Sequence, residues 1–121
     1  MLPVVGNNDV YPDYNMDVSD VTQTLAQLAQ SWAPLLQSDE ERSTVARGGF
    51  LQREVAPGLI VASLNTLLYS RNGNSHGQAD PLGQFAWLST VLQNASQAHK
   101  TVYIAGHIPP IIDACEWRRK N

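Results

Sequence analysis

Residues 101–110 read Thr-Val-Tyr-Ile-Ala-Gly-His-Ile-Pro-Pro, and this stretch decides how the rest of the chain is interpreted. Its first residues are β-branched or aromatic, which predicts a short strand over residues 101–104. Gly106 ends that strand, and the two prolines exclude a helix after it. His107 is therefore expected just past the carboxyl end of a strand, where α/β folds often place their chemistry. The alternative is a loop histidine before a proline turn, and this stretch alone leaves both open.

The first nine residues follow the same order of residue types. They read Met-Leu-Pro-Val-Val-Gly-Asn-Asn-Asp, which we interpret as the end of a strand over residues 2–5, a glycine, and three side chains that carry oxygen atoms. A short apolar run, a glycine and polar side chains thus recur near both ends of the chain.

Two helices are expected between these stretches and the middle of the chain. Apolar residues recur every three or four positions over residues 20–37, and Pro34 should end or bend this helix early. Ser38 and Glu41 form a capping box, in which Glu41 reaches back to the serine, and a second helix should continue to about residue 47. Acidic residues are favourable at a helix start, so we do not interpret residues 39–41 as a metal site.

Two strands and a third helix complete the pattern. Residues 50–55 alternate and residues 59–65 are almost continuously apolar, which predicts a half-exposed strand beside a central one. Asp80 and Pro81 should start the third helix. Its expected inner face consists of Leu82, Phe85, Leu88, Val91 and Leu92. Helices that alternate with strands predict an α/β layer arrangement, with roughly three helices and four to five strands.

Composition narrows the class of protein. A chain of 121 residues forms one domain, and a formal net charge of -3 gives no electrostatic case for a nucleic-acid partner. No apolar run approaches the roughly 18 residues of a transmembrane segment. Cys115 is the only cysteine, so no internal disulfide is expected. The first motif follows Met1 so closely that we expect no signal peptide in this chain.

The stretches 6–9 and 106–110 together resemble two metal-binding motifs of the calcineurin-like metallophosphoesterases. That superfamily has a Gly-Asn-His-Asp or Gly-Asn-His-Glu loop and a later histidine at a strand end, and its acid sphingomyelinase-like branch has Gly-His-Ile-Pro-Pro. Supporting matches follow in the same order: Gly48-Gly49-Phe50, Pro57-Gly58-Leu59, Ser63-Leu64-Asn65, Asp80-Pro81-Leu82-Gly83-Gln84 and Trp87-Leu88. The resemblance implies that residues 1–121 are one partial domain, the central part of a four-layer α/β/β/α sandwich.

The resemblance also implies a chemistry, the hydrolysis of phosphoric esters with two divalent cations, zinc or another transition metal. Two cations about 3.5–4 Å apart activate water and hold the phosphoryl oxygens. Asn7 and His107 match ligands of the same one of these metals, so they should meet in space from opposite ends of the chain. The substrate would contain phosphate, either a phospholipid such as sphingomyelin or a polyphosphate. Oligomeric state stays open.

The resemblance further implies a secreted, lysosomal or vacuolar protein, since most of the family is found there. This conflicts with the expected absence of a signal peptide. Near the end of the third helix, Asn94-Ala95-Ser96 is a sequon for N-glycosylation, which has meaning only in a secreted chain.

One position departs from the family pattern. Asn8 stands where most of the superfamily has a histidine that helps to neutralise the leaving group. An asparagine can donate a hydrogen bond there but cannot give up a proton. The general acid is therefore open, with His76, Asp9 and Asp13 as candidates. The Gly-Asn-Asn-Asp form also occurs in endopolyphosphatase-like relatives, which favours polyphosphate.

Other expected ligands are missing. The Asp-x-His, Gly-Asp-x-x-Asp and Gly-His-x-His motifs of the family do not occur in this sequence. Two neutral ligands cannot hold a pair of divalent cations against water, so we expect the isolated chain to be inactive. The alternative from another class is a non-catalytic domain that binds a partner.

Overall fold

A computed structural model describes residues 1–6, 9, 16–18, 21–69 and 77–108 of the chain. Three helices and three strands follow in the order α1 (Thr22–Trp32), α2 (Asp39–Gly48), β1 (Leu51–Ala56), β2 (Leu59–Ser63), α3 (Gln84–Gln97) and β3 (Thr101–Ala105). Short 3-10 turns form η2 (Ala33–Leu35), η3 (Thr66–Tyr69) and η4 (Pro81–Gly83). The predicted α/β class is confirmed.

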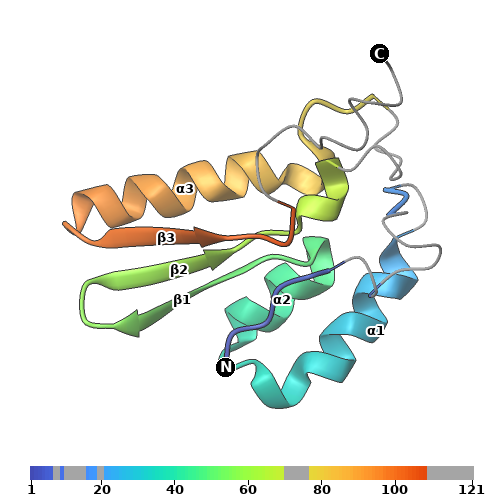
Figure 1. Ribbon diagram of the computed structural model, residues 1–121, viewed down its shortest axis with the longest axis horizontal. Helices are drawn as coiled ribbons and strands as arrows, with labels where there is room; N and C mark the ends of the chain where they lie inside the picture. Colours follow the sequence, from blue (N-terminus) through green and yellow to red (C-terminus); the bar gives the residue numbers. More distant parts are fainter. Residues whose placement is uncertain (7–8, 10–15, 19–20, 70–76, 109–121) are drawn as a thin grey trace.

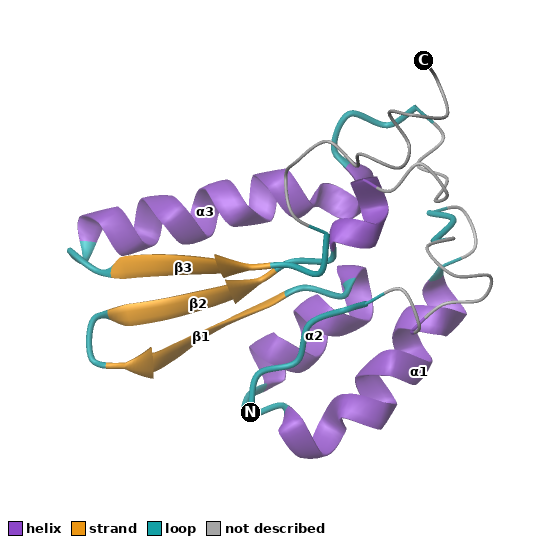
Figure 2. Cartoon of the chain, in the orientation of Figure 1, coloured by secondary structure: helices purple, strands orange, loops and turns teal. Residues whose placement is uncertain are grey.

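The strands form one sheet with the order β1-β2-β3 (Figure 2). β1 and β2 are an antiparallel hairpin, whereas β2 and β3 are parallel, with Ser63 opposite Ala105. The pairing continues for one more bond, from Leu64 N to Ala105 O at 2.8 Å. The carboxyl ends of β2 and β3 therefore lie at the same edge, and the segments that follow them start side by side.

The described residues contain three strands, fewer than the four or five that we predicted. Residues 2–5, which we expected to end a strand, are not assigned to one. Proline has no N–H to contribute to a ladder, and side chains hold this segment instead. Ser63 Oγ donates to Pro3 O at 2.7 Å, and Arg53 Nη1 donates to Met1 O at 2.9 Å.

The helices lie on either side of the sheet. α3 packs against β3 and β2, α2 packs against β1, and α1 packs against α2 (Figure 1). The helix predicted over residues 20–37 ends at Trp32, because Pro34 lies in the 3-10 turn that follows, as expected. Within the described residues, no helix is long and apolar enough to cross a membrane.

The start and orientation of α3 differ from our prediction. Leu82 and Gly83 have left-handed backbone conformations, with φ of 56° and 71°, so the helix begins only at Gln84. Asp80 still binds the start of this helix, since its carboxylate accepts hydrogen bonds from the backbone amides of Phe85 and Ala86 in the first turn. Phe85 and Leu92, which we placed on the inner face, are 52% and 41% exposed. The inner face is centred instead on Gln84, Val91 and Ala95.

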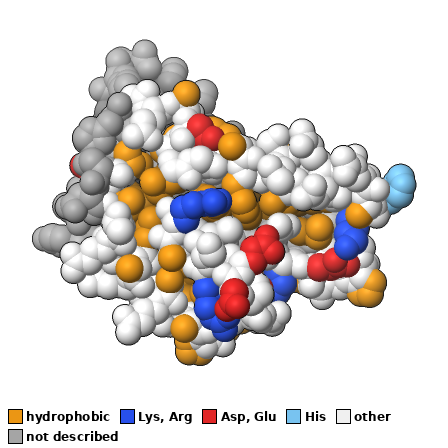
Figure 3. Space-filling view, turned by 180° about the vertical axis from the view of Figure 1, so that it is seen from behind, with side chains coloured by type: hydrophobic (Ala, Val, Ile, Leu, Met, Phe, Trp, Pro, Cys, Tyr) orange, Lys and Arg blue, Asp and Glu red, His pale blue; other side chains and the backbone are white. Residues whose placement is uncertain are grey.

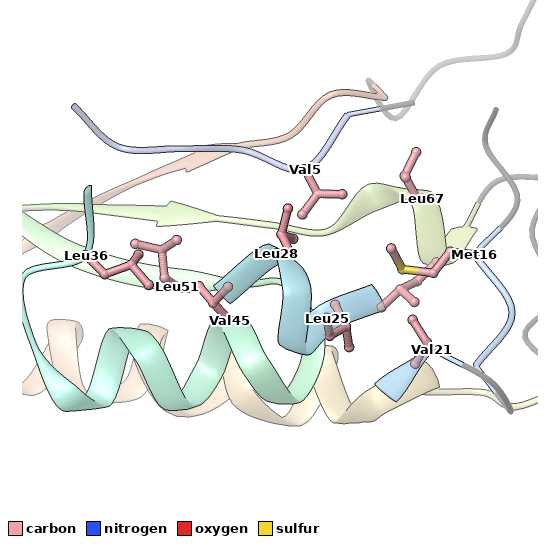
Figure 4. Close-up of a cluster of buried hydrophobic side chains, with 10 residues drawn as sticks. Val5, Met16, Val21, Leu25, Leu28, Leu36, Val45, Leu51 and Leu67 are labelled. Carbon is pink, nitrogen blue, oxygen red and sulfur yellow. The ribbon is translucent and has the colours of Figure 1, made fainter. Parts of the chain in front are cut away.

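The main hydrophobic core lies between the sheet, the N-terminal segment and the helix pair α1–α2 (Figure 4). Its buried members are Val5, Met16, Val21, Leu25, Leu28, Leu36, Val45, Leu51, Leu67 and Leu68. On the far side, Phe50 packs against Trp87 with ring centroids 4.6 Å apart, which ties the end of α2 to α3. Because Val5 belongs to the main core, it fixes the N-terminal segment against the rest of the fold.

A buried ion pair joins α2 to β1. The Ser38 hydroxyl accepts the amide of Glu41 at 3.1 Å, as the capping box requires. The Glu41 carboxylate, however, does not complete that box but accepts from Arg53 Nη2 at 2.5 Å and from Nε at 3.3 Å. Arg53 also donates to Leu35 O at 2.8 Å. One guanidinium therefore holds α2, η2 and the N-terminal segment against β1.

Glu41→Gln should lower the free energy of unfolding by about 3 kcal/mol, because it leaves the buried Arg53 charge without its anionic partner. The matched control is Asp39→Asn, which breaks the exposed pair with Arg42 on the same helix turn. That change should cost no more than about 1 kcal/mol. Urea unfolding followed by tryptophan fluorescence measures both, and equal losses would contradict this account of Arg53.

Candidate metal centre at the carboxyl edge of the sheet

The N-terminal segment and the loop after β3 meet at the carboxyl edge of β2 and β3. A Cβ atom built on Gly6 would lie 3.6 Å from Nδ1 and 3.8 Å from Cε1 of His107. These are ordinary van der Waals separations, so the backbone of Gly6 lies directly beside the imidazole. Two stretches from opposite ends of the chain are therefore brought together.

Asp9 closes a turn at the same place. The amide of Gly6 donates to Asp9 Oδ2 at 2.7 Å, and the amide of Asp9 donates back to Gly6 O at 3.1 Å. The same carboxylate oxygen lies 3.8 Å from a Cβ built on Gly6. Asp9 is thus bound to Gly6 at both its side chain and its backbone, and its carboxylate faces the side of Gly6 on which His107 lies.

Thr66 holds the loop of His107 from the other side. Its hydroxyl accepts the amide of Ile108 at 2.9 Å. Its methyl group lies so close to Gly106 that a Cβ there would be only 2.7 Å away. The residues before and after His107 are both fixed by this one side chain, which is 8% exposed. The imidazole itself is exposed at the edge of the sheet.

A buried amide network positions Thr66 in turn. The backbone amide of Asn65 donates to Gln84 Oε1 at 2.6 Å, and its carbonyl accepts from Gln84 Nε2 at 3.1 Å. The Asn65 side chain donates to Gly48 O at 2.8 Å and to Met16 Sδ at 2.9 Å. Asn65 and Gln84 are fully buried, so the segment after β2 is pinned to α2 and α3.

One acceptor in this network has no partner among the described residues, the buried Asn65 Oδ1. A buried amide oxygen without a hydrogen bond costs stability. It belongs to the residue directly before Thr66, within the network that positions the candidate site.

Ionisable groups near the network respond to burial and hydrogen bonding. Burial raises the pKa of Tyr69. The hydroxyl accepts a hydrogen bond from Gln84 at 2.6 Å, and this bond opposes part of the rise in the pKa. The Tyr69 ring stacks on Phe85 with centroids 5.0 Å apart. At the opposite end of the sheet, a hydrogen bond from Lys100 lowers the pKa of Glu54. That pair is distant from His107 and belongs to the hairpin end.

The predicted site residues fall into two groups. Asn7, Asn8, Asp13 and His76 lie outside the described residues, so their predicted roles stay predictions. His107 and Asp9 are described, and the structure brings both to Gly6. An imidazole and a carboxylate are chemically suited to a divalent transition metal. Within the described part of the chain, His, Cys, Asp and Glu side chains do not gather in any group of three or more that could hold a metal ion.

Thr66, Gln84 and Asn65 are the positioning residues that our sequence analysis did not identify. Asn65 and Gln84 occur in two of the supporting motifs, at a strand end and at a helix start. Those motifs gave no sign that the two side chains meet. A glutamine at a helix start is usually exposed, so its burial cannot be predicted until the packing of the helix is known.

Comparison with known proteins identifies relatives of the chain. It is 45% identical over 114 residues to sphingomyelinase phosphodiesterase D of Dictyostelium discoideum, covering 93% of this chain and 25% of that protein. It is 38% identical to the human cyclic GMP-AMP phosphodiesterase SMPDL3A, covering 90% and 24%. A Yarrowia lipolytica endopolyphosphatase is 32% identical, covering 92% and 15%. The chain thus spans about a quarter or less of these relatives. No family model matches it.

Thr66→Val should release the loop of His107, because valine keeps the shape of threonine but cannot accept the Ile108 amide. Leaving that partly buried amide without an acceptor should cost about 1–3 kcal/mol. Thr66→Ser keeps the hydroxyl and loses one methyl group, at a cost of about 0.8 kcal/mol. Amide hydrogen exchange separates the two variants, since Ile108 should lose protection in the valine variant only. Equal protection in both would show that the hydroxyl does not fix this loop.

Proposed function

Because the chain is homologous to a segment of the sphingomyelin phosphodiesterase-like metallophosphoesterases, we propose that it contributes to the metal centre of a phosphoric ester hydrolase. The observation that supports this best is the contact between Gly6 and His107. Gly6, which precedes Asn7 in the sequence, meets the loop of His107 at the carboxyl edge of two parallel strands, where α/β enzymes place their sites.

In this proposal Asn7 and His107 are ligands of one divalent cation. An amide oxygen and a neutral imidazole add no charge, so the cation keeps its electrophilic character. When bound, a pair of such cations supplies Lewis-acid polarisation of the phosphoryl oxygens. Asn8 donates a hydrogen bond to the leaving-group oxygen. Two neutral ligands are too few for two cations, so the proposal requires further ligands that this sequence does not supply.

The candidate substrates are two classes of phosphate compound. The names of the relatives point to sphingomyelin and to polyphosphate. Asn8 favours polyphosphate, since the phosphate leaving group of a phosphoanhydride needs less help from a proton donor than an alkoxide does. We propose a secreted, lysosomal or vacuolar location, as the resemblance implies.

Replacing the matching segment of the Dictyostelium sphingomyelinase phosphodiesterase D by this chain gives a direct test. The chimaera should hydrolyse sphingomyelin or long-chain polyphosphate in a reaction that a chelator stops. Asn7→Ala and His107→Ala should each lower kcat/KM by about 100-fold or more, since even residues behind the ligands commonly contribute 10–100-fold. Metal content, measured by mass spectrometry of the purified protein, should fall in parallel.

His99→Asn is the matched control for the histidine substitution. His99 is exposed just before β3, and its φ of 55° is one that asparagine tolerates. It should leave activity and metal content unchanged. A folded chimaera that binds no metal, or one whose activity survives loss of both Asn7 and His107, would favour the non-catalytic binding domain.

A further inference from the structure

The outer side of α3 carries a feature that the metal centre does not use. Asn94-Ala95-Ser96 is the one Asn-x-Ser/Thr sequon among the 121 residues. Asn94 and Ser96 are exposed, whereas Ala95 between them is 2% exposed and packs toward the sheet. We propose that Asn94 carries an N-linked oligosaccharide. This proposal rests on the proposed function only for the compartment, since the modification requires entry into the secretory pathway.

The folded chain can accommodate a glycan on Asn94, whose side chain is exposed. Its backbone carbonyl accepts the amide of Ala98 at 3.1 Å, and this bond does not involve the side chain. The other described asparagine, Asn65, is fully buried and bonded through its side-chain nitrogen. Asn65-Thr66-Leu67 is also no sequon. The sequence signal and the exposed position therefore coincide at Asn94 alone within the described residues.

A glycan on Asn94 would not obstruct the candidate metal centre, which lies at the opposite end of the sheet. The last turn of α3 leads directly into β3, where Lys100 N donates to Ala95 O at 2.8 Å. His107 follows the other end of β3, and five strand residues span roughly 16 Å at about 3.3 Å each. Figure 1 shows α3 running along β3 from one end to the other. A glycan at Asn94 would leave the carboxyl edge open.

Helix geometry also orders the events. An N-glycosylation acceptor typically lies in a surface loop, where the asparagine amide and the hydroxyl of the third sequon residue can be recognised together. Residues i and i+2 of a helix do not face each other. Asn94 and Ser96 both lie within α3, so the Ser96 hydroxyl cannot reach the amide once the helix has formed. The transfer therefore precedes the folding of α3.

The reaction takes its sugar from a lipid-linked pyrophosphate oligosaccharide. A bond forms between Asn94 Nδ2 and C1 of the first sugar, while the bond from that C1 to the phosphate oxygen breaks. The lipid pyrophosphate leaves with the electron pair, and the amide gives one proton to a base of the transferase. Nothing is oxidised or reduced, and the transferase and the sugar donor are the only components that the chain does not supply.

The first test is made on the protein from its own cells. Trypsin should release a peptide of residues 72–100, which contains Asn94 and no other sequon. Digestion with a peptide-N-glycosidase in heavy-oxygen water should convert Asn94 to aspartate that carries the heavy isotope. Recovery of this peptide solely in its unmodified form would overturn the proposal.

The second test uses variants of the full chain, directed into the secretory pathway of eukaryotic cells by a cleavable leader. The wild type and Ser96→Thr should lose mass on glycosidase treatment, whereas Ser96→Ala should not change. Whole-cell lysate is analysed, so a variant that folds poorly is still counted. A glycan in Ser96→Ala, or none in the wild type, would contradict the assignment.

A third comparison tests the order of events and separates this proposal from the hydrolase. Chain that has been folded before it meets the transferase should stay unmodified, and efficient modification of folded chain would overturn the inferred order. Ser96→Ala in the Dictyostelium chimaera should keep metal content and kcat/KM. The glycosylation proposal can therefore be overturned while the metal-centre proposal survives, and the metal-centre proposal can be overturned while the glycosylation proposal survives.

Discussion

The parallel pairing of β2 with β3 is the constraint on which the candidate site depends. It places Thr66 and His107, which follow the two strands, at one edge of the sheet. Because the connection between parallel strands must cross the sheet, α3 has to run back along it, and this brings Gln84 to Asn65. The helix that makes the parallel pair possible thus also fixes the loop beside the imidazole.

The N-terminal half of the site depends on side chains rather than on the sheet. Residues 2–5 make no ladder, so Gly6 is positioned by Val5 in the core and by hydrogen bonds from Ser63 and Arg53 to backbone carbonyls. Arg53 is itself oriented by the buried Glu41. Loosening this ion pair would therefore act on the position of Gly6 as well as on stability, although the pair is distant from Gly6 in sequence.

The helices, strands and breaks were predictable because their signals are local. Periodicity located α1, the Ser38 cap located α2, and Pro34 and Gly106 ended their elements. The remaining features depend on partners that a local pattern cannot reveal. The inner face of α3 is turned toward Gln84, which is fully buried and bonded to Asn65, while Phe85 and Leu92 stay exposed. For the same reason the capping box identified the role of Ser38 but not the ion pair of Glu41.

Among the described residues, the sheet is open at β3, the strand that His107 follows. In the part of the chain that the structure describes, β3 pairs with β2 alone. Within β3, the adjacent residues Tyr103 and Ile104, whose side chains face opposite sides of the sheet, are 63% and 54% exposed. Figure 3 shows hydrophobic side chains exposed in a broken band across the face opposite to that of Figure 1. Parallel strands are usually covered on both faces. A segment that paired in parallel with the open edge of β3 would have its carboxyl end beside His107. The same contact would therefore bury β3 and bring further side chains to the candidate site.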